Sequence, residues 1–193
     1  MDRPDQPRLA WGLTGSGHFL RECLALANEL PDVDLFLSSA GEEVLHMYGH
    51  PLTGLREGFR IFRDNTASAA PVGLLYHGHY HTVVIAPATS NTVAKCVAGI
   101  SDTLPTNIFA QAGKCRIPSI VFACDTAPRM ETESPSDWVT VYPRPIDLEN
   151  TRRLQDLDQV SVVETFEALR AAIERRLAQV ERDADARSLL AAK

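Results

Sequence analysis

The strongest constraint on the fold of this chain is a buried strand that leads directly into a small, hydroxyl-rich turn and a helix. The apolar run Thr82–Ile85 is typical of a parallel strand covered on both faces. The segment Ala86–Lys95 follows it and opens a helical pattern after a turn of short side chains. Ligands of open α/β sheets bind beyond the carboxyl ends of the strands. This segment therefore predicts a parallel sheet with a ligand site at the turn.

Strand-like and helix-like segments alternate along the rest of the chain. The expected strands cover residues 9–13, 33–37, 59–62, 82–85, 118–123 and 138–142. The expected helices cover residues 18–30, 42–48, 89–99, 101–113 (with Ser101 as N-cap) and 166–180. Such alternation predicts an α/β fold: a Rossmann-like or flavodoxin-like open parallel sheet with helices on both faces.

The chain of 193 residues is long enough for one domain with a sizeable core, so we expect a single domain over residues 1–193. Residues 181–193 form a charged tail that either extends the last helix or frays. The segment 126–137 carries prolines and serines without periodicity, which predicts a loop that serves as a lid or as a solvated connector.

Composition and charge exclude several classes of partner. The net charge is −6 without a basic stripe, which argues against nucleic-acid binding. No apolar run approaches the roughly 18 residues that span a bilayer, and the polar N-terminus has no signal-peptide core. The cysteines lack the spacing of metal or iron–sulfur ligands, so reduced structural thiols are expected. We therefore expect a cytoplasmic protein without membrane contact.

Three ligand loops are expected at successive strand ends. Thr14–Gly17 joins a strand to a helix, where glycines allow close backbone approach and a helix N-terminus favours an anion. It is not the G-x-G-x-x-G fingerprint of dinucleotide sites, so it indicates a mononucleotide phosphate. The other two loops are Ser38–Ala40 and Ala86–Thr92, both rich in short polar side chains. Together they predict a phosphate-bearing cofactor at one edge of the sheet.

Two other chemistries receive less support. The alternate histidines His77, His79 and His81 would share one face of a strand, but no carboxylate or cysteine accompanies them, so no metal site is expected. The alternative is a polar helix end or loop before the next strand. The sequence around Ser16 only superficially resembles the G-x-S-x-G elbow of serine hydrolases, because the second glycine follows the serine directly.

The segment Pro87–Thr92 resembles the proline-alanine-serine-alanine-asparagine-threonine signature of the homo-oligomeric flavin-containing cysteine decarboxylase family of flavoproteins. Thr14–Gly17 resembles the family's phosphate loop, and Gly99–Leu104 resembles the helix start that reaches a neighbouring subunit's flavin. The resemblance is strongest over residues 8–125. The family includes phosphopantothenoylcysteine decarboxylase, flavin prenyltransferases and archaeal-type flavoproteins such as the dihydromethanopterin reductases.

The resemblance implies an FMN cofactor at an interface of a homotrimer or a multiple of trimers. Gly15 and Ser16 would hold the phosphate, and Ser101, Asp102 and Leu104 would approach from the same or an adjacent chain. The residues expected to bind FMN are Thr14, Gly15, Ser16, His18, Ser38, Ser39, Ala86, Pro87, Ala88, Thr89, Ser90, Asn91, Thr92, Ser101, Asp102 and Leu104.

Departures from the family pattern favour the archaeal-type reductases. The histidine of the decarboxylases would fall near Gly73, where this chain has none, and their methionine-containing clamp is not evident after Asp125. The Asp-x-Glu-Asn segment at 147–150 matches the reductases. The resemblance thus implies FMN-dependent reduction of dihydromethanopterin, or a similar dihydropterin, by hydride transfer from flavin N5. A decarboxylase, a prenyltransferase or a non-catalytic FMN electron carrier is the alternative.

The sequence leaves the catalytic proton donor unassigned. His18 at the head of the first helix can titrate near neutral pH, although a helix N-terminus lowers a histidine pKa. Because the chain lacks iron–sulfur ligands, the electrons are expected from a diffusible donor such as NAD(P)H, ferredoxin or a flavin.

Overall fold

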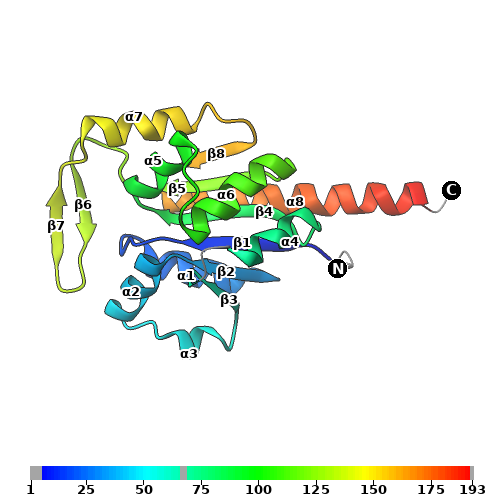
Figure 1. The fold of residues 1–193 in the computed structure, drawn as a ribbon, viewed down its shortest axis with the longest axis horizontal. Helices are drawn as coiled ribbons and strands as arrows, with labels where there is room; N and C mark the ends of the chain where they lie inside the picture. The colour runs from blue at the N-terminus through cyan, green and yellow to red at the C-terminus, as the bar shows by residue number, and fades with distance from the viewer. Residues whose placement is uncertain (1–5, 66–68, 192–193) are drawn as a thin grey trace.

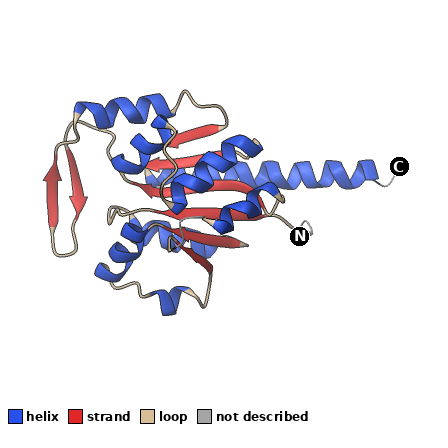
Figure 2. Cartoon of the chain, viewed as in Figure 1, coloured by secondary structure: helices blue, strands red, loops and turns tan. Residues whose placement is uncertain are grey.

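The computed structural model describes residues 6–65 and 69–191, which form one parallel sheet between two layers of helices (Figures 1 and 2). The sheet consists of β1 (Arg8–Leu13), β2 (Val33–Leu37), β3 (Arg60–Arg63), β4 (Tyr80–Ala88), β5 (Ser119–Ala123) and β8 (Val160–Val163). The helices are α1 (Leu20–Glu29), α2 (Ser39–Met47), α3 (Leu52–Leu55), α4 (Gly73–Tyr76), α5 (Ser90–Ala98), α6 (Leu104–Cys115), α7 (Pro145–Leu154) and α8 (Phe166–Ala191), with a 3-10 turn η1 (Ala70–Val72).

The strand order confirms the predicted fold class. The six strands run β3-β2-β1-β4-β5-β8, and every neighbouring pair is parallel. The chain moves outward from β1 in one direction and then returns to place β4 on the other side of β1. The loops that follow β1 and β4 therefore diverge, which leaves a crevice at the topological switch point where ligands of such sheets bind.

Alternating side chains of the strands build one apolar core on each face of the sheet. Leu9, Trp11 and Leu13 of β1 pack in one core with residues of α1, α2 and α8. Ala10 faces the other core, which contains residues of α4, α5, α6 and α7. Burial on both faces explains the near-continuous apolar runs of the central strands.

One predicted strand of the sheet is wrong. Residues 138–142 were expected to form the sixth strand, but β7 (Trp138–Val141) pairs antiparallel with β6 (Met130–Glu133) in a separate hairpin. This hairpin stands off the end of the molecule toward which the strands of the sheet point (Figure 1). The sixth sheet position belongs to β8, which pairs with β5. Trp138 is 62% exposed, so its apolar character does not reflect a core position.

The turn after β4, the start of α6 and the presence of α7 also differ from the sequence prediction. Ala86–Ala88 were expected in a turn but complete β4, where they are buried. Helix α6 begins at Leu104, and Thr103 rather than Ser101 is its N-cap, in a capping box with Thr106. Helix α7 was not predicted; Arg144 and Asp147 form a reciprocal cap at its start, with Pro145 in the first turn.

Helix α8 continues through most of the predicted tail and projects past the sheet on the side of the N-terminus (Figure 1). Residues 192–193 of that tail, and residues 1–5 of the polar N-terminal segment, lie outside the described residues. Arg176 ties α8 to the sheet through hydrogen bonds to Thr82 Oγ1 (3.0 Å) and to the carbonyl oxygen of His81 (2.9 Å). Among the described residues, none of the helices has both the length and the apolar character needed to cross a bilayer.

A buried carboxylate joins four strands near their amino ends. Asp34 of β2 is fully buried and accepts hydrogen bonds from Arg8 Nε of β1 (2.8 Å), Arg60 Nε of β3 (3.0 Å) and the Tyr80 hydroxyl of β4 (2.7 Å). Burial, followed by the hydrogen bond to Asp34, raises the pKa of Tyr80, so the phenol stays protonated and donates. The cluster therefore stabilises the edge of the sheet opposite the predicted site.

Asp34→Asn is expected to lower the free energy of unfolding by about 3 kcal/mol, because it removes a buried charge that neutralises two arginines. Asp32→Asn is the matched control: Asp32 pairs with the same Arg8 but its side chain is about half exposed, so the expected loss is below about 1 kcal/mol. Urea unfolding of both variants measures the two free energies. Equal losses would show that the buried Asp34 contributes no more to stability than the half-exposed Asp32.

Candidate functional site

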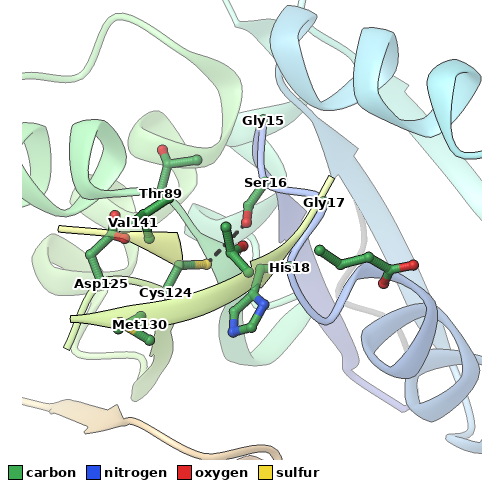
Figure 3. Close-up of a pocket in the computed structure, with 11 residues that line it drawn as sticks. Gly15, Ser16, Gly17, His18, Thr89, Cys124, Asp125, Met130 and Val141 are labelled. Atoms are coloured by element: carbon green, nitrogen blue, oxygen red, sulfur yellow. Dashed lines mark hydrogen bonds between the residues drawn. The ribbon is translucent and has the colours of Figure 1, made fainter. Parts of the chain in front are cut away.

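The loops after β1, β4 and β5 meet at the carboxyl edge of the sheet and enclose a cavity of about 240 Å³ (Figure 3). The hairpin β6–β7 forms its remaining wall. The lining residues are Gly15, Ser16, Gly17, His18, Thr89, Cys124, Asp125, Met130, Thr132, Glu133 and Val141. The cavity thus brings together four of the predicted residues, Gly15, Ser16, His18 and Thr89.

Thr14 joins two of these loops instead of lining the cavity. Its hydroxyl donates a hydrogen bond to the carbonyl oxygen of Pro87 (2.7 Å) and accepts one from the amide of Thr89 (3.1 Å). Three residues earlier, Trp11 Nε1 donates to the carbonyl oxygen of Ala86 (2.6 Å). These buried contacts hold the loop after β1 against the end of β4, which contains a cis peptide bond between Ala86 and Pro87.

The loop Gly15–Gly17 presents backbone donors at its turn. Within the described chain, the amides of Gly15, Ser16 and Gly17 donate to no acceptor. Gly15 passes so close to α2 that an added Cβ would lie 2.8 Å from Ala40 Cβ, so only glycine fits there. At Gly17 a Cβ would overlap the Tyr48 ring. A donor-rich turn at the start of a helix suits an anion such as a phosphate.

Two predicted residues, Ser38 and Thr89, cap helices. Ser38 Oγ accepts the Gly41 amide (2.9 Å) at the start of α2, and Thr89 Oγ1 accepts the Thr92 amide (3.2 Å) at the start of α5. Ser39 donates to the carbonyl oxygen of Asp64 (3.2 Å). Both helices therefore direct their N-termini toward the carboxyl edge of the sheet, where their dipoles favour negative charge.

The remaining predicted residues lie outside the cavity. The Ser90 hydroxyl donates to the Asp125 carboxylate, Asn91 is exposed, and Thr92 is buried in the first turn of α5. Ser101 and Asp102 are exposed, and Asp102 pairs with Lys95 (2.8 Å). The Leu104 side chain is buried, and its amide donates to Asp64 (3.0 Å). In a single chain, Gly99–Leu104 therefore does not reach the cavity.

Sequence reasoning missed the residues that close the cavity. Cys124 and Asp125 directly follow the predicted strand 118–123, so the same strand-end argument used for the other loops could have found them. Met130, Thr132 and Glu133 lie in the segment 126–137, which was predicted as a lid or connector loop; residues 130–133 of it form β6, and Val141 comes from β7. The Tyr48 hydroxyl donates to the Glu133 carbonyl oxygen (2.8 Å), which fixes the hairpin to the end of α2.

Burial controls the protonation of two groups at the cavity. Burial raises the pKa of Cys124 to about 12, against the opposing effect of a hydrogen bond to Ser16 Oγ (3.2 Å), so the thiol is neutral at pH 7. Burial also lowers the pKa of His18, and the carboxylates of Asp125, Glu22 and Glu133 act in the opposite direction. The His18 Nδ1 atom is buried and has no hydrogen-bond partner in the described chain.

The predicted histidine cluster does not lie at this site. His77 ends α4 and His81 lies in β4, both at the amino end of that strand and thus at the opposite edge of the sheet. Burial lowers the pKa of His81 to about 4. Among the residues that the structure describes, no three or more histidine, cysteine, aspartate or glutamate side chains are placed to share a metal ion. The four cysteines are free thiols.

Comparisons with known proteins agree with this geometry. A family model described as Flavoprotein matches residues 2–188. An uncharacterized protein of Methanocaldococcus jannaschii is 35% identical over 175 residues, which cover 86% of this chain and 94% of that protein. A dihydromethanopterin reductase (acceptor) of Methanosarcina mazei is 38% identical over 141 residues, 66% of this chain. The match spans only 59% of that reductase's length.

Among solved structures, DmrB of Burkholderia xenovorans in complex with FMN, described as a cubic protein cage for redox transfer, is 58% identical. It superposes with a TM-score of 0.86 over 92% of this chain and 98% of DmrB. The family model matches nearly the whole sequence, and the parallel sheet with its strand-end loops agrees with it. The chain therefore belongs to the Flavoprotein family.

Proposed function

We propose that this chain is an FMN-dependent oxidoreductase that reduces dihydromethanopterin, or a similar dihydropterin, to the tetrahydro form. The observation that carries the proposal is the donor-rich loop Gly15–Gly17 at the switch point of the sheet, in a chain 58% identical to a protein solved with FMN. That the chain is a flavoprotein rests on family membership, and the oxidoreductase activity is supported by its similarity to DmrB, described as a cage for redox transfer. The substrate rests on the name of a reductase that this chain matches over part of its length.

The FMN prediction is confirmed by the family and by the FMN complex of DmrB. The residues at the cavity also fit such a group: free amides and two helix N-termini suit a phosphate, and the buried Nδ1 of His18 lacks a partner. A volume of about 240 Å³ is below the 300–1,000 Å³ typical of cofactor sites. This supports a site that is completed by a second copy of the chain.

In this proposal Gly15 and Ser16 hold the phosphate, and the turn Thr89–Thr92 contacts the rest of the cofactor. FMN supplies the two-electron chemistry, a hydride from N5, when it is bound. The chain orients the dihydropterin against the ring, keeps water out beneath the hairpin and provides a proton. Cys124 serves as packing, because its buried thiol stays neutral.

The partners follow from the same observations. Electrons would come from a diffusible donor such as NAD(P)H, ferredoxin or a flavin, since the cysteines lack the sequence spacing of iron–sulfur ligands. The assembly is a homotrimer or a multiple of trimers, in line with the cage described for DmrB. A second copy would bring Ser101, Asp102 and Leu104 to a neighbour's cofactor.

Chemically reduced, FMN-loaded protein mixed anaerobically with dihydromethanopterin is expected to regain its visible flavin absorbance while tetrahydropterin forms. The reason is that a bound dihydropterin accepts both electrons of the reduced cofactor. Free reduced FMN at the same concentration is the control for uncatalysed transfer. A flavin that stays reduced with the dihydropterin, but is reoxidised by ferricyanide, would exclude pterin reduction and leave a redox-active flavoprotein.

Ser16→Asp is expected to raise the dissociation constant of FMN by roughly 100-fold, because a carboxylate in the cavity opposes the phosphate at low effective dielectric. Ser161→Asp adds the same charge on an exposed position of β8 and is the matched control, with an expected change below about threefold. Quenching of FMN fluorescence on binding measures both. Equal effects of the two variants would place the phosphate away from this loop.

A further inference from the structure

His18 reaches the cavity with a ring nitrogen that nothing in the described chain satisfies. The residue follows Gly17 in the loop after β1, lines the cavity and is only 9% exposed (Figure 3). Its Nδ1 atom is buried and unpartnered. A buried polar atom without a partner costs about 1–3 kcal/mol, so such atoms in native sites are matched by a ligand or by water. The Nδ1 atom of His18 is therefore free to form a hydrogen bond with a ligand at the cavity.

Three carboxylates surround this imidazole. Glu22 lies one turn along α1, Asp125 follows β5, and Glu133 belongs to the hairpin. Arg21 partly neutralises Glu133 at 3.5 Å. The carboxylates favour the imidazolium, whereas burial favours the neutral ring. Burial has the larger effect, so the pKa of His18 lies below its ordinary value, which makes its imidazolium a stronger acid than a free one.

Three other titratable groups at the cavity already take part in hydrogen bonds with neighbouring residues. The Cys124 thiol donates to Ser16, and its pKa of about 12 keeps the proton in place. The Tyr48 hydroxyl, which lies over Gly17, donates to the Glu133 backbone, and burial raises its pKa. Asp125 accepts the Ser90 hydroxyl. His18 is the group at the cavity that combines a free nitrogen with a proton it can release.

We propose that His18 is the proton donor for reduction of the dihydropterin, an inference that rests on the proposed function. Reduction of the C=N bond adds a hydride to carbon, with its two electrons from the reduced cofactor, and a proton to nitrogen. The imidazolium of His18 gives that proton and becomes neutral, and the cofactor is left oxidised by two electrons. Solvent then returns a proton to the imidazole before the next turnover.

The test compares His18→Gln with His77→Gln, in which an exposed histidine at the far edge of the sheet is replaced in the same way. In single turnovers of the reduced, FMN-loaded protein, His18→Gln is expected to slow reoxidation by the dihydropterin by 10²–10⁴-fold. With both proteins saturated with FMN, reoxidation by ferricyanide, which takes electrons without a proton, is expected to change less than about threefold. His77→Gln is expected to change neither rate.

The pH profile gives a second readout. The proton donor acts in its charged form, so the wild-type rate with dihydropterin falls as pH rises through the pKa of His18, and this fall is absent in His18→Gln. NMR titration of the imidazoles in the FMN-loaded protein identifies the same pKa as the signal that His18→Gln removes. A dihydropterin rate and a pH profile unchanged in His18→Gln would overturn the proposal, as would a variant whose main defect is loss of FMN.

These outcomes separate the inference from the proposed function. If wild-type protein reduces ferricyanide but not dihydropterin, the proposed function fails and the inference fails with it. If wild-type protein reduces dihydropterin and His18→Gln does so equally well, only the inference is overturned.

Discussion

The site depends on the two hydrogen bonds of the Thr14 hydroxyl. One is buried and the other partly buried, and they join the loop after β1 to the end of β4 across the point where the chain reverses direction in the sheet. Without them the two loops would diverge, because the crossovers that follow leave toward opposite sides. With them, the free amides of Gly15–Gly17 and the N-terminus of α5 converge on one cavity, where their partial charges add.

Acidic groups face this donor-rich edge. Glu133 and Asp125 line the same cavity, and the net charge of the chain is negative. The donors that this edge offers are therefore backbone amides and helix dipoles, while the carboxylates lie near His18. The hairpin that carries Glu133 is held through Tyr48 and Arg21. The cavity thus combines a turn of free backbone amides with the carboxylates of Asp125 and Glu133.

The central strands and the loops that follow them could be predicted because local periodicity and strand ends determine them. The runs at 9–13, 33–37 and 118–123 are buried on both faces, which gives an unambiguous apolar pattern. The hairpin and β8 are short strands with exposed residues, so their patterns do not distinguish a sheet strand from a separate ribbon. Trp138 illustrates the problem: an aromatic residue predicted a core that it does not join.

The sequence by itself determined the family, the parallel fold, the FMN cofactor and the three loops at the carboxyl edge, because each rests on neighbouring residues. Only the tertiary structure decided which of the predicted residues reach the cavity. Ser38, Thr14 and Thr92 were predicted as ligand contacts; in the described chain the Ser38 hydroxyl caps α2, the Thr14 hydroxyl joins two loops, and the Thr92 amide donates to the cap of α5. The hairpin residues became part of the site through contacts between segments far apart in the chain, which no local pattern encodes.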